Sequence, residues 1–241
     1  MKLVNYQPSS PEELVALDEL LLHKAETGGI GETLRLWTPD EYFIAAGRAS
    51  TISQDCFMER CRRERIKIIR RISGGGTVLQ GPGCLNYSLV LAYESDGKYR
   101  LIRTSYLAIL ERVAGLLRDR GLAAEFFPVS DLAIDGKKIS GNAQARKRSY
   151  LLHHGTFMVD FDIDRISGLL RHPASEPEYR KGRPHRDFVR NIPVDMEEMK
   201  RVIMKAFSAA EGEWEPASGD TEELKSLISR KYADKGWNYM F

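Results

Sequence analysis

The chain has 241 residues, of which 42% are hydrophobic and 29% are charged, a balance typical of a globular protein and not of a disordered one. Its 36 Lys and Arg residues nearly balance its 34 Asp and Glu residues, so no overall charge would attract nucleic acid. No stretch reaches the roughly 20 apolar residues of a membrane helix and no apolar signal core follows the N-terminus, so we expect a cytoplasmic protein with reduced cysteines and no membrane partner.

The first predicted helix begins at Ser10. The segment Ser10-Pro11-Glu12-Glu13 combines an N-cap serine, a proline at the first helical position and the glutamate of a capping box. Apolar residues then repeat at helical spacing until Gly28-Gly29, which we expect to end the helix. Short apolar runs at 34–37 and 43–46 follow, and a basic stretch near 54–64 is predicted to be helical.

Strands dominate the middle of the chain. A buried strand is predicted over 66–69, before Ser73-Gly74-Gly75-Gly76, and a central strand over 85–91, which alternates at first and then becomes fully apolar. The other predicted elements are a helix over 100–120, strands over 125–127, 131–134, 138–141 and 155–161, and helices near 195–210 and 221–232. Runs of strands with helices outside them predict an α+β fold with a mixed, mostly antiparallel sheet flanked by helices. Without a repeat or a linker, we expect one domain over residues 1–241.

Three consecutive glycines make residues 73–76 a candidate ligand-binding loop. Glycine lets main-chain N–H groups approach an anionic or flat ligand closely, and Arg71 just upstream offers a planar fork for phosphate or carboxylate. The loop is neither a P-loop nor a dinucleotide fingerprint, because Gly76 leads into a strand-like run instead of a helix. The alternative interpretation is a glycine-rich hairpin or bulge that has only a structural role.

A lysine lies on the predicted strand after the Asp135-Gly136 turn. Strand alternation would place Lys138, Ser140 and Asn142 on one face of this strand, with Gly141 on the other. An ammonium presented into a pocket suits a carboxylate that attacks the α-phosphate of ATP, because negative charge grows on that phosphate. The alternative is a solvated lysine in a hairpin. His153 and His154, at the start of the next strand, point to opposite faces and make a poor metal pair.

Three segments together resemble the lipoate–protein ligase A family, that is, the biotin/lipoate A/B protein ligase catalytic domain. The segment from Arg70 to Val78 is similar to the glycine-rich loop of these ligases, the segment from Asp131 to Gln144 to their catalytic lysine strand, and His154-Gly155-Thr156 to the motif that follows it. Supporting matches are Gly47-Arg48, Leu85-Asn86-Tyr87-Ser88, Lys231-Tyr232 and Trp237-Asn238. The motifs keep the family's order from about the first helix to the C-terminus.

The resemblance implies a biotin/lipoate-ligase-like fold and a two-step reaction. Lipoate and ATP, with Mg²⁺ as activator, would give lipoyl-adenylate, and a lysine of a lipoyl domain of a 2-oxoacid dehydrogenase or of glycine-cleavage H protein would then take the lipoyl group. By the same resemblance Lys138 would be catalytic. The residues implied to bind lipoyl-adenylate or ATP are Arg71, Ser73, Gly74, Gly75, Gly76, Thr77, Gln80, Asp131, Lys138, Ser140, Gly141, Asn142, His154, Gly155 and Thr156. Asp131 is also the implied magnesium ligand.

Some positions depart from the family pattern. Gln80 stands where the family usually has histidine, so this position cannot titrate as an imidazole. Ser130 replaces a common asparagine and Ser50 a usual glutamine. The chain ends soon after Trp237-Asn238, where many ligases continue into a small C-terminal accessory domain, so we expect either a separate accessory subunit or a supply of preactivated acyl groups.

The nearest alternative function is an octanoyl- or lipoyl-transferase that takes its acyl group from an acyl carrier protein or a lipoylated protein through a cysteine nucleophile. Residues 121–130, where cysteine-dependent relatives have that thiol, contain no cysteine, and Cys84 is the only thiol close to a motif. A biotin ligase lacks support because its Gly-Arg-Gly-Arg loop is absent. A non-catalytic adaptor would not need Lys138. The acyl group, lipoate or octanoate, and the acceptor protein stay open.

Overall fold

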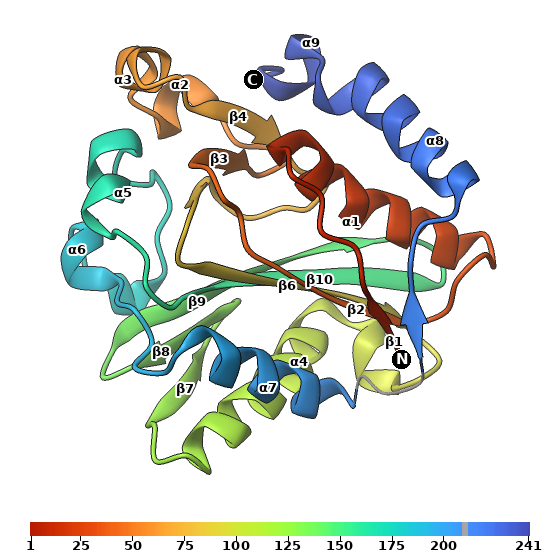
Figure 1. Cartoon of the computed structure of the whole chain (residues 1–241). Helices are drawn as coiled ribbons and strands as arrows, with labels where there is room; N and C mark the ends of the chain where they lie inside the picture. Colours follow the sequence, from red (N-terminus) through yellow and green to blue (C-terminus); the bar gives the residue numbers. More distant parts are fainter. Residues whose placement is uncertain (209–211) are drawn as a thin grey trace.

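The computed structural model describes residues 1–208 and 212–241 and places a large sheet at the centre of the molecule (Figure 1). Its eight strands have the order β11-β1-β2-β6-β10-β9-β8-β7. In chain order they are β1 (Lys2–Val4), β2 (Thr33–Trp37), β6 (Cys84–Ala92), β7 (Ala124–Phe127), β8 (Asp131–Ile134), β9 (Lys137–Arg146), β10 (Tyr150–Met158) and β11 (Glu213–Trp214). Among the described strands of this sheet, the pairings of β1 with β2 and with β11 are parallel and the others are antiparallel, so the prediction of an α+β fold with a mostly antiparallel sheet is confirmed.

A small sheet carries the glycine-rich loop. Its three strands have the order β4-β3-β5, with β3 parallel to β4 and antiparallel to β5. They are β3 (Phe43–Ala46), β4 (Lys67–Arg70) and β5 (Val78–Gln80). The loop is the connection between β4 and β5, so the strand predicted before it is confirmed with a shift of one residue.

The helices are α1 (Pro11–Glu26), α2 (Ile52–Asp55), α3 (Met58–Arg63), α4 (Ile102–Arg118), α5 (Asp164–Leu169), α6 (His185–Phe188), α7 (Met196–Phe207), α8 (Ser218–Leu227) and α9 (Lys235–Asn238). Two 3₁₀ turns, η1 (Gly97–Arg100) and η2 (Glu178–Arg180), and a π turn, η3 (Ile228–Tyr232), accompany them. Within the described residues, no helix combines the length and apolar character that crossing a membrane requires.

The predicted start of α1 is confirmed in detail. The Ser10 side chain accepts a hydrogen bond from the Glu13 backbone N–H at 3.2 Å, and the Glu13 carboxylate bonds back to Ser10, which completes the capping box. The helix buries most of its length, including the carboxylate of Asp18 among its apolar residues. Such a buried carboxylate must have polar partners, which the site supplies.

Three predicted elements need correction. The basic stretch near 54–64 is two short helices instead of one, because Cys56 between them is extended and pairs with Leu170. The strand predicted over 155–161 is β10, which starts at Tyr150 and ends at Met158, since a tight turn without glycine joins it to β9. The helix predicted to reach residue 210 is α7, which ends at Phe207, and residues 209 and 210 lie outside the described residues.

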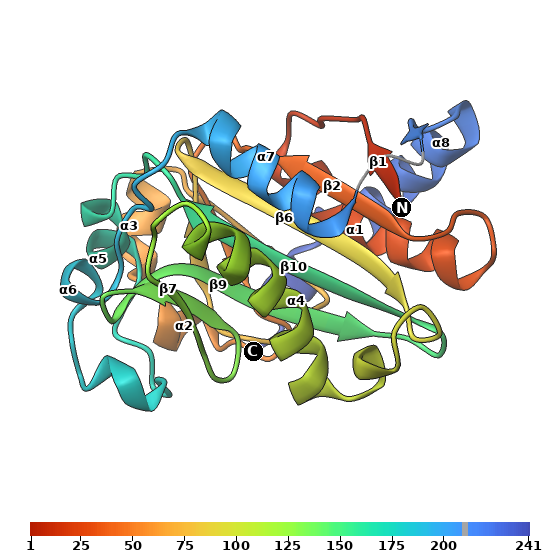
Figure 2. The same ribbon diagram turned by 90° about the horizontal axis from the view of Figure 1, so that it is seen from below.

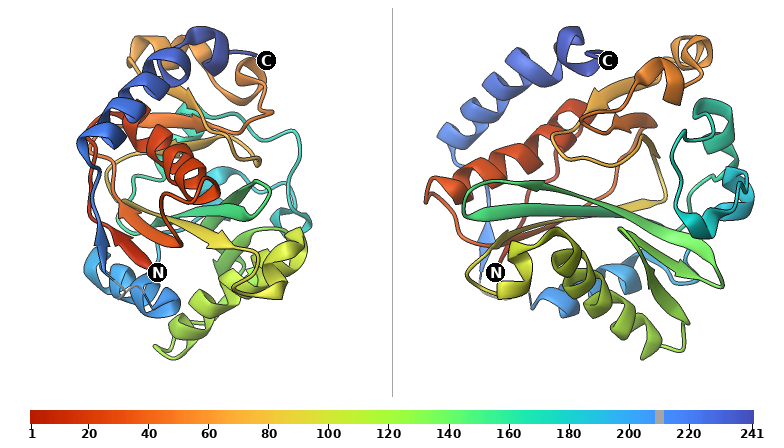
Figure 3. Two further views of the ribbon diagram at one scale, coloured as in Figure 1. Left: turned by 90° about the vertical axis from the view of Figure 1, so that its right-hand side faces the viewer. Right: turned by 180° about the vertical axis from the view of Figure 1, so that it is seen from behind.

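Helices cover both faces of the large sheet. From below, α4 and α7 lie across one face, where they enclose the largest apolar cluster with β6, β9 and β10 (Figure 2). On the opposite face lie α1 and the small sheet, with α8 and α9 outside α1 (Figure 3). The glycine-rich loop is therefore held between the small sheet and the face of the large sheet that α4 and α7 leave uncovered.

Candidate active site

A cavity of about 810 Å³ lies between the small sheet and the large one. Its wall includes Val15 and Asp18 of α1, the glycine-rich loop at Gly75 and Gly76, and Lys138 of β9. Segments that are far apart in the sequence thus meet around one space. The glycine-rich loop and the lysine strand, which the sequence singled out separately, lie on the same cavity.

Strand register arranges the cavity floor in two rows. Paired residues of neighbouring strands lie on the same face of a sheet. One row crosses five strands and contains Trp37, Asn86, Thr156, Gly141 and Asp131. The adjacent row crosses four strands and contains Arg35, Ser88, His154 and Ala143. The first row has a single charge, at Asp131, whereas the second brings an arginine and a histidine under the cavity.

Lys138 reaches the first row through a gap that Gly141 leaves. The Lys138 Nζ lies 2.8 Å from Asp131 Oδ1, and a Cβ added at Gly141 would lie 2.7 Å from that Nζ. The ammonium therefore occupies the space above Gly141. This corrects the predicted alternation, in which Lys138 shared a face with Ser140 and Asn142. A register shift in the β8–β9 pairing inserts one residue between Lys138 and Ser140, so alternation breaks there.

Asp131 is held from two sides. Its Oδ1 faces Lys138, and its Oδ2 accepts a hydrogen bond from the Tyr179 hydroxyl at 2.8 Å. Burial and the adjacent carboxylate raise the pKa of Tyr179, so the phenol stays protonated and keeps donating. Within the described part of the chain, no three acidic, histidine or cysteine side chains form a group that could hold a metal ion. A magnesium ion here would need ligands from a bound phosphate in addition to Asp131.

Arg71 shapes the glycine-rich loop from the inside. Its Nη2 donates to the carbonyls of Gly74 and Gly76 at 2.6 and 2.8 Å, and its Nη1 donates to the Ala45 carbonyl at 2.9 Å. Gly75 between them adopts φ +81°, which favours glycine. Burial lowers the pKa of Arg71 to about 10, so its guanidinium is still charged at neutral pH. The arginine therefore fixes the loop by binding its backbone.

Arg70 anchors the same loop from the outside. Its fully buried guanidinium donates to the carbonyls of Gly47 at 2.8 Å, Arg48 at 3.0 Å and Ser50 at 2.9 Å, and to that of Trp237 at 3.1 Å. The segment at Gly47 in turn touches the loop, since a Cβ at Gly47 would lie 1.9 Å from the Gly75 carbonyl oxygen. These contacts give a structural reason for the Gly47-Arg48 and Trp237-Asn238 motifs.

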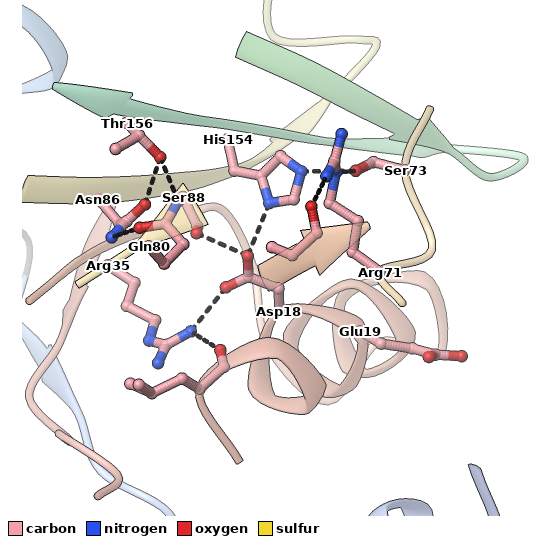
Figure 4. A network of polar contacts seen from close by, with 12 residues as sticks. Asp18, Glu19, Arg35, Arg71, Ser73, Gln80, Asn86, Ser88, His154 and Thr156 are labelled. Carbon is pink, nitrogen blue, oxygen red and sulfur yellow. Dashed lines mark hydrogen bonds and ion pairs between the residues drawn. The ribbon is translucent and has the colours of Figure 1, made fainter. Parts of the chain in front are cut away.

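A chain of polar contacts runs from α1 to the loop (Figure 4). Asp18 accepts hydrogen bonds from Arg35 at 2.8 Å and Ser88 at 2.8 Å, and lies 2.9 Å from His154 Nδ1. The His154 Nε2 is 2.6 Å from the hydroxyl of Ser73, which also accepts from Arg71 Nε at 2.9 Å. Burial acts to raise the pKa of Asp18, but the His154 hydrogen bond and the Arg35 charge outweigh it and leave that pKa below its usual value.

A closed ring of hydrogen bonds lies on the first row. Gln80 Nε2 donates to the Thr156 hydroxyl at 2.7 Å, Thr156 donates to Asn86 Oδ1 at 2.5 Å, and Asn86 Nδ2 donates to Gln80 Oε1 at 2.9 Å (Figure 4). Gln80 therefore occupies the cavity wall as an uncharged residue that its neighbours orient. The ring gives this part of the floor no titratable group.

Most of the predicted site residues meet at the cavity. Its lining includes Arg71, Gly75, Gly76, Thr77, Gln80, Asp131, Lys138, Gly141, Asn142, His154, Gly155 and Thr156. Ser73, Gly74 and Ser140 do not line it. Ser140 is fully buried on the strand, and Ser73 acts behind the wall through Arg71 and His154. Sequence reasoning missed Asp18 and Arg35, whose only signal is a charged residue within a mostly apolar segment of a helix and of a strand.

The cysteines lack the environment of a nucleophile. Cys84 lines the cavity, but it is buried and burial raises its pKa to about 12. Cys56 and Cys61 are buried in the apolar cluster around α5 and α6, where a mutual hydrogen bond and burial raise the pKa of Cys56. The bond to Cys56 lowers the pKa of Cys61, but that thiol is buried, faces the Leu169 carbonyl at 4.0 Å and does not line the cavity.

Comparisons with known proteins support the resemblance. Residues 10–208 match the family model of the lipoyl protein ligase A/B catalytic domain. Octanoyltransferase LipM of Halalkalibacterium halodurans is 25% identical over 262 residues, with 95% of each chain covered. Lipoate–protein ligase 1 of Staphylococcus aureus is 29% identical over 182 residues, which cover 72% of this chain and 54% of the relative.

Two solved structures have the same fold. A chain of the bi-partite lipoate protein ligase from Thermoplasma acidophilum is similar with a TM-score of 0.82 and 23% identity, covering 99% of this chain and 95% of that one. A lipoate-protein ligase A bound with ATP is similar with a TM-score of 0.81 and 24% identity, covering 99% and 98%. The lipoate-ligase-like fold predicted from the motifs is therefore confirmed.

Proposed function

The chain belongs to the lipoyl protein ligase A/B catalytic domain family, whose enzymes are ligases or octanoyltransferases, and we propose that it is a lipoate–protein ligase. In the first step the lipoate carboxylate would attack the α-phosphorus of ATP and pyrophosphate would leave. In the second step the amine of an acceptor lysine would attack the acyl carbonyl of lipoyl-adenylate. The bond to AMP would break, and the amine would lose a proton as the amide forms.

The observation that carries this proposal is the Lys138–Asp131 pair on the wall of the cavity that the glycine-rich loop also lines. The Lys138 side chain is about a quarter exposed, and the carboxylate beside it orients the ammonium. In the cavity, this charge would stabilise the negative charge that develops on the α-phosphate and then on the departing AMP. Lys138 is therefore the residue to which we assign catalysis.

The cavity offers different surroundings to the two substrates. Val15, Trp37 and Ala45 give it an apolar part beside the loop, suited to an acyl chain. Lys138, Asp131 and Arg180 give it a charged part, suited to a nucleotide. ATP would enter as its magnesium complex, in which the phosphates supply most ligands and Asp131 is the nearest carboxylate once Lys138 turns to the phosphate.

An octanoyltransferase is the second candidate, and the 95% coverage of the LipM relative supports it. That reaction needs an activated thiol to form an acyl-cysteine. Cys84 is the thiol on the cavity, and the high pKa that burial gives it disfavours the thiolate. We therefore place the ligase first.

One assay separates the two candidates. The purified chain is incubated with a lipoyl domain and either lipoate with ATP and magnesium or an octanoyl carrier protein. We expect product with the first donor set, together with lipoate-dependent exchange between ATP and pyrophosphate. Product with the second donor alone would make the protein a transferase. A chain that binds lipoyl domains but yields no product, with or without added subunits, would be an adaptor.

We propose lipoyl domains of 2-oxoacid dehydrogenases or glycine-cleavage H protein as acceptors. The Thermoplasma ligase is described with its E2 lipoyl domain and as bi-partite, which supports such an acceptor and also a second polypeptide that assists adenylation. If adenylate forms only when a cell extract or a candidate subunit is added, the second polypeptide is required. Exchange between ATP and pyrophosphate by the chain alone would show that no second polypeptide is required.

A further inference from the structure

The polar chain from α1 to the glycine-rich loop has a direction that its donors and acceptors determine. Arginine nitrogens always donate, and an ionised carboxylate only accepts. Asp18 is ionised, so His154 Nδ1, 2.9 Å away, must carry the hydrogen of that bond. Ser73 Oγ accepts from Arg71 Nε at 2.9 Å. The hydroxyl hydrogen of Ser73 then has His154 Nε2, at 2.6 Å, as its acceptor.

Hydrogen bonds are therefore donated in the order Arg71 to Ser73 to His154 to Asp18. Arg35 donates to Asp18 from the other side and so holds the last acceptor in place. In this arrangement each hydrogen along the chain has an acceptor, which matters because Ser73 is 1% exposed and has no access to water. Reversing the histidine tautomer would make Nε2 a second donor to Ser73 and leave the serine hydrogen without a partner in the chain.

We propose that Asp18 is a positioning residue for acyl binding, acting through His154 and Ser73 on Arg71 and the glycine-rich loop. Arg71 is the link to the ligand, because it holds the carbonyls of Gly74 and Gly76 and lines the cavity itself. Its Nε end is oriented by Ser73 alone among side chains. A carboxylate on a helix near the N-terminus thereby sets the shape of a loop more than fifty residues later in the chain.

Asp18→Asn tests the direction of the chain. The amide has nearly the same shape, but its Nδ2 would donate to His154 Nδ1 and force the hydrogen onto Nε2. We expect the KM for lipoate to rise about 10- to 100-fold, which is the range for losing one buried hydrogen bond to a charged partner. The KM for ATP and the kcat should change less than about threefold. Ser88→Ala is the matched control, since it removes another donor to Asp18 without breaking the chain.

A structural readout keeps the proposal independent of the assigned reaction. The ¹⁵N shifts of the His154 ring, assigned by comparison with His154→Gln, should show a protonated Nδ1 in the wild-type protein and a protonated Nε2 in Asp18→Asn. Ser73→Ala opens the chain at its other end and leaves the Asp18–Arg35 pair intact. It should raise the lipoate KM to a similar degree even if Asp18→Asn folds poorly.

The positioning role rests on the proposed ligase function, and the two can fail separately. If no acyl donor gives product, the assigned reaction is wrong. The His154 tautomer and the dissociation constant for lipoate would still test the role of the hydrogen-bond chain from Asp18 to Arg71. If the wild-type protein carries the hydrogen on Nε2, or if Asp18→Asn and Ser73→Ala both bind lipoate as tightly as wild type, the positioning role is refuted.

Discussion

Replacing Lys138 with methionine removes the ammonium and keeps most of the side-chain volume. The Nζ lies 2.8 Å from Asp131 Oδ1, and we expect the α-phosphate to bind beside it. Unit charges about 4 Å apart interact by about 4 kcal/mol at an effective dielectric constant near 20. Loss of one group that stabilises charge in the transition state typically lowers kcat by about 10²- to 10³-fold, or about 2.7–4 kcal/mol. We expect a loss of adenylation in that range.

The fold should survive this change. The Asp131 carboxylate keeps its hydrogen bond from Tyr179, and the lysine side chain is partly exposed, so its removal should destabilise the protein by about 1–2 kcal/mol. Lys137→Met is the matched control, because Lys137 is exposed and precedes Lys138 on the same strand. It should leave activity within about twofold of wild type.

The assay is lipoate-dependent exchange between ATP and pyrophosphate, followed by single-turnover transfer from preformed lipoyl-adenylate to a lipoyl domain. We expect Lys138→Met to lose both exchange and transfer, since negative charge develops on the α-phosphate in the first step and on the departing AMP in the second. Exchange by Lys138→Met within about threefold of wild type would refute the role that we assign to this lysine.

Three further predictions follow from the site and its surroundings. Gly141→Ala would place a methyl group 2.7 Å from the Lys138 Nζ and displace the ammonium, so we expect adenylation in the exchange assay to fall about tenfold or more. Gly97→Ala is the control in the same assay, because a Cβ added at Gly97 has no atom within 4 Å. Cys84→Ala should keep ligase activity within about twofold and lower the free energy of unfolding by about 1 kcal/mol, whereas complete loss of acyl transfer from a carrier protein would favour the transferase. Burial lowers the pKa of His153 to about 3, so below pH 6.5 the unfolded chain binds more protons than the folded protein. The free energy of unfolding should therefore fall there by up to about 1.4 kcal/mol for each pH unit of acidification. Denaturant titrations from pH 5 to 7.5 should show that this free energy depends less on pH in His153→Gln than in the wild-type protein, and an equal pH dependence would contradict a neutral buried imidazole.

Local sequence patterns predicted much of this site. The glycines of the loop and the lysine strand could be recognised in the sequence because each function needs particular residue types at short spacing. The exact strand ends could not be predicted as well. The tight turn between β9 and β10 contains no glycine or asparagine, so nothing in residues 147–149 marks where one strand stops and the next begins.

The face on which Lys138 lies could not be read from alternation. Simple counting puts it with Ser140, but the register shift opposite Leu132 and Ala133 moves it to the face of Gly141. Such a bulge depends on how two strands pair, and neither strand shows it alone. The same glycine that seemed to belong to the opposite face turns out to make room for the ammonium.

Asp18 shows the limit more clearly. Within the sequence it is one of several acidic residues of α1, and the residues that justify its burial come from other parts of the chain: Arg35 from β2 and His154 from β10, the latter 136 residues away. Only the register of β2, β6 and β10 places Arg35, Ser88 and His154 in one row beneath it. A buried charge in a sequence therefore signals that polar partners exist, and the sheet decides which ones. Here the partners include the serine of the glycine-rich loop, which ties the packing of the first helix to the shape of the candidate acyl site.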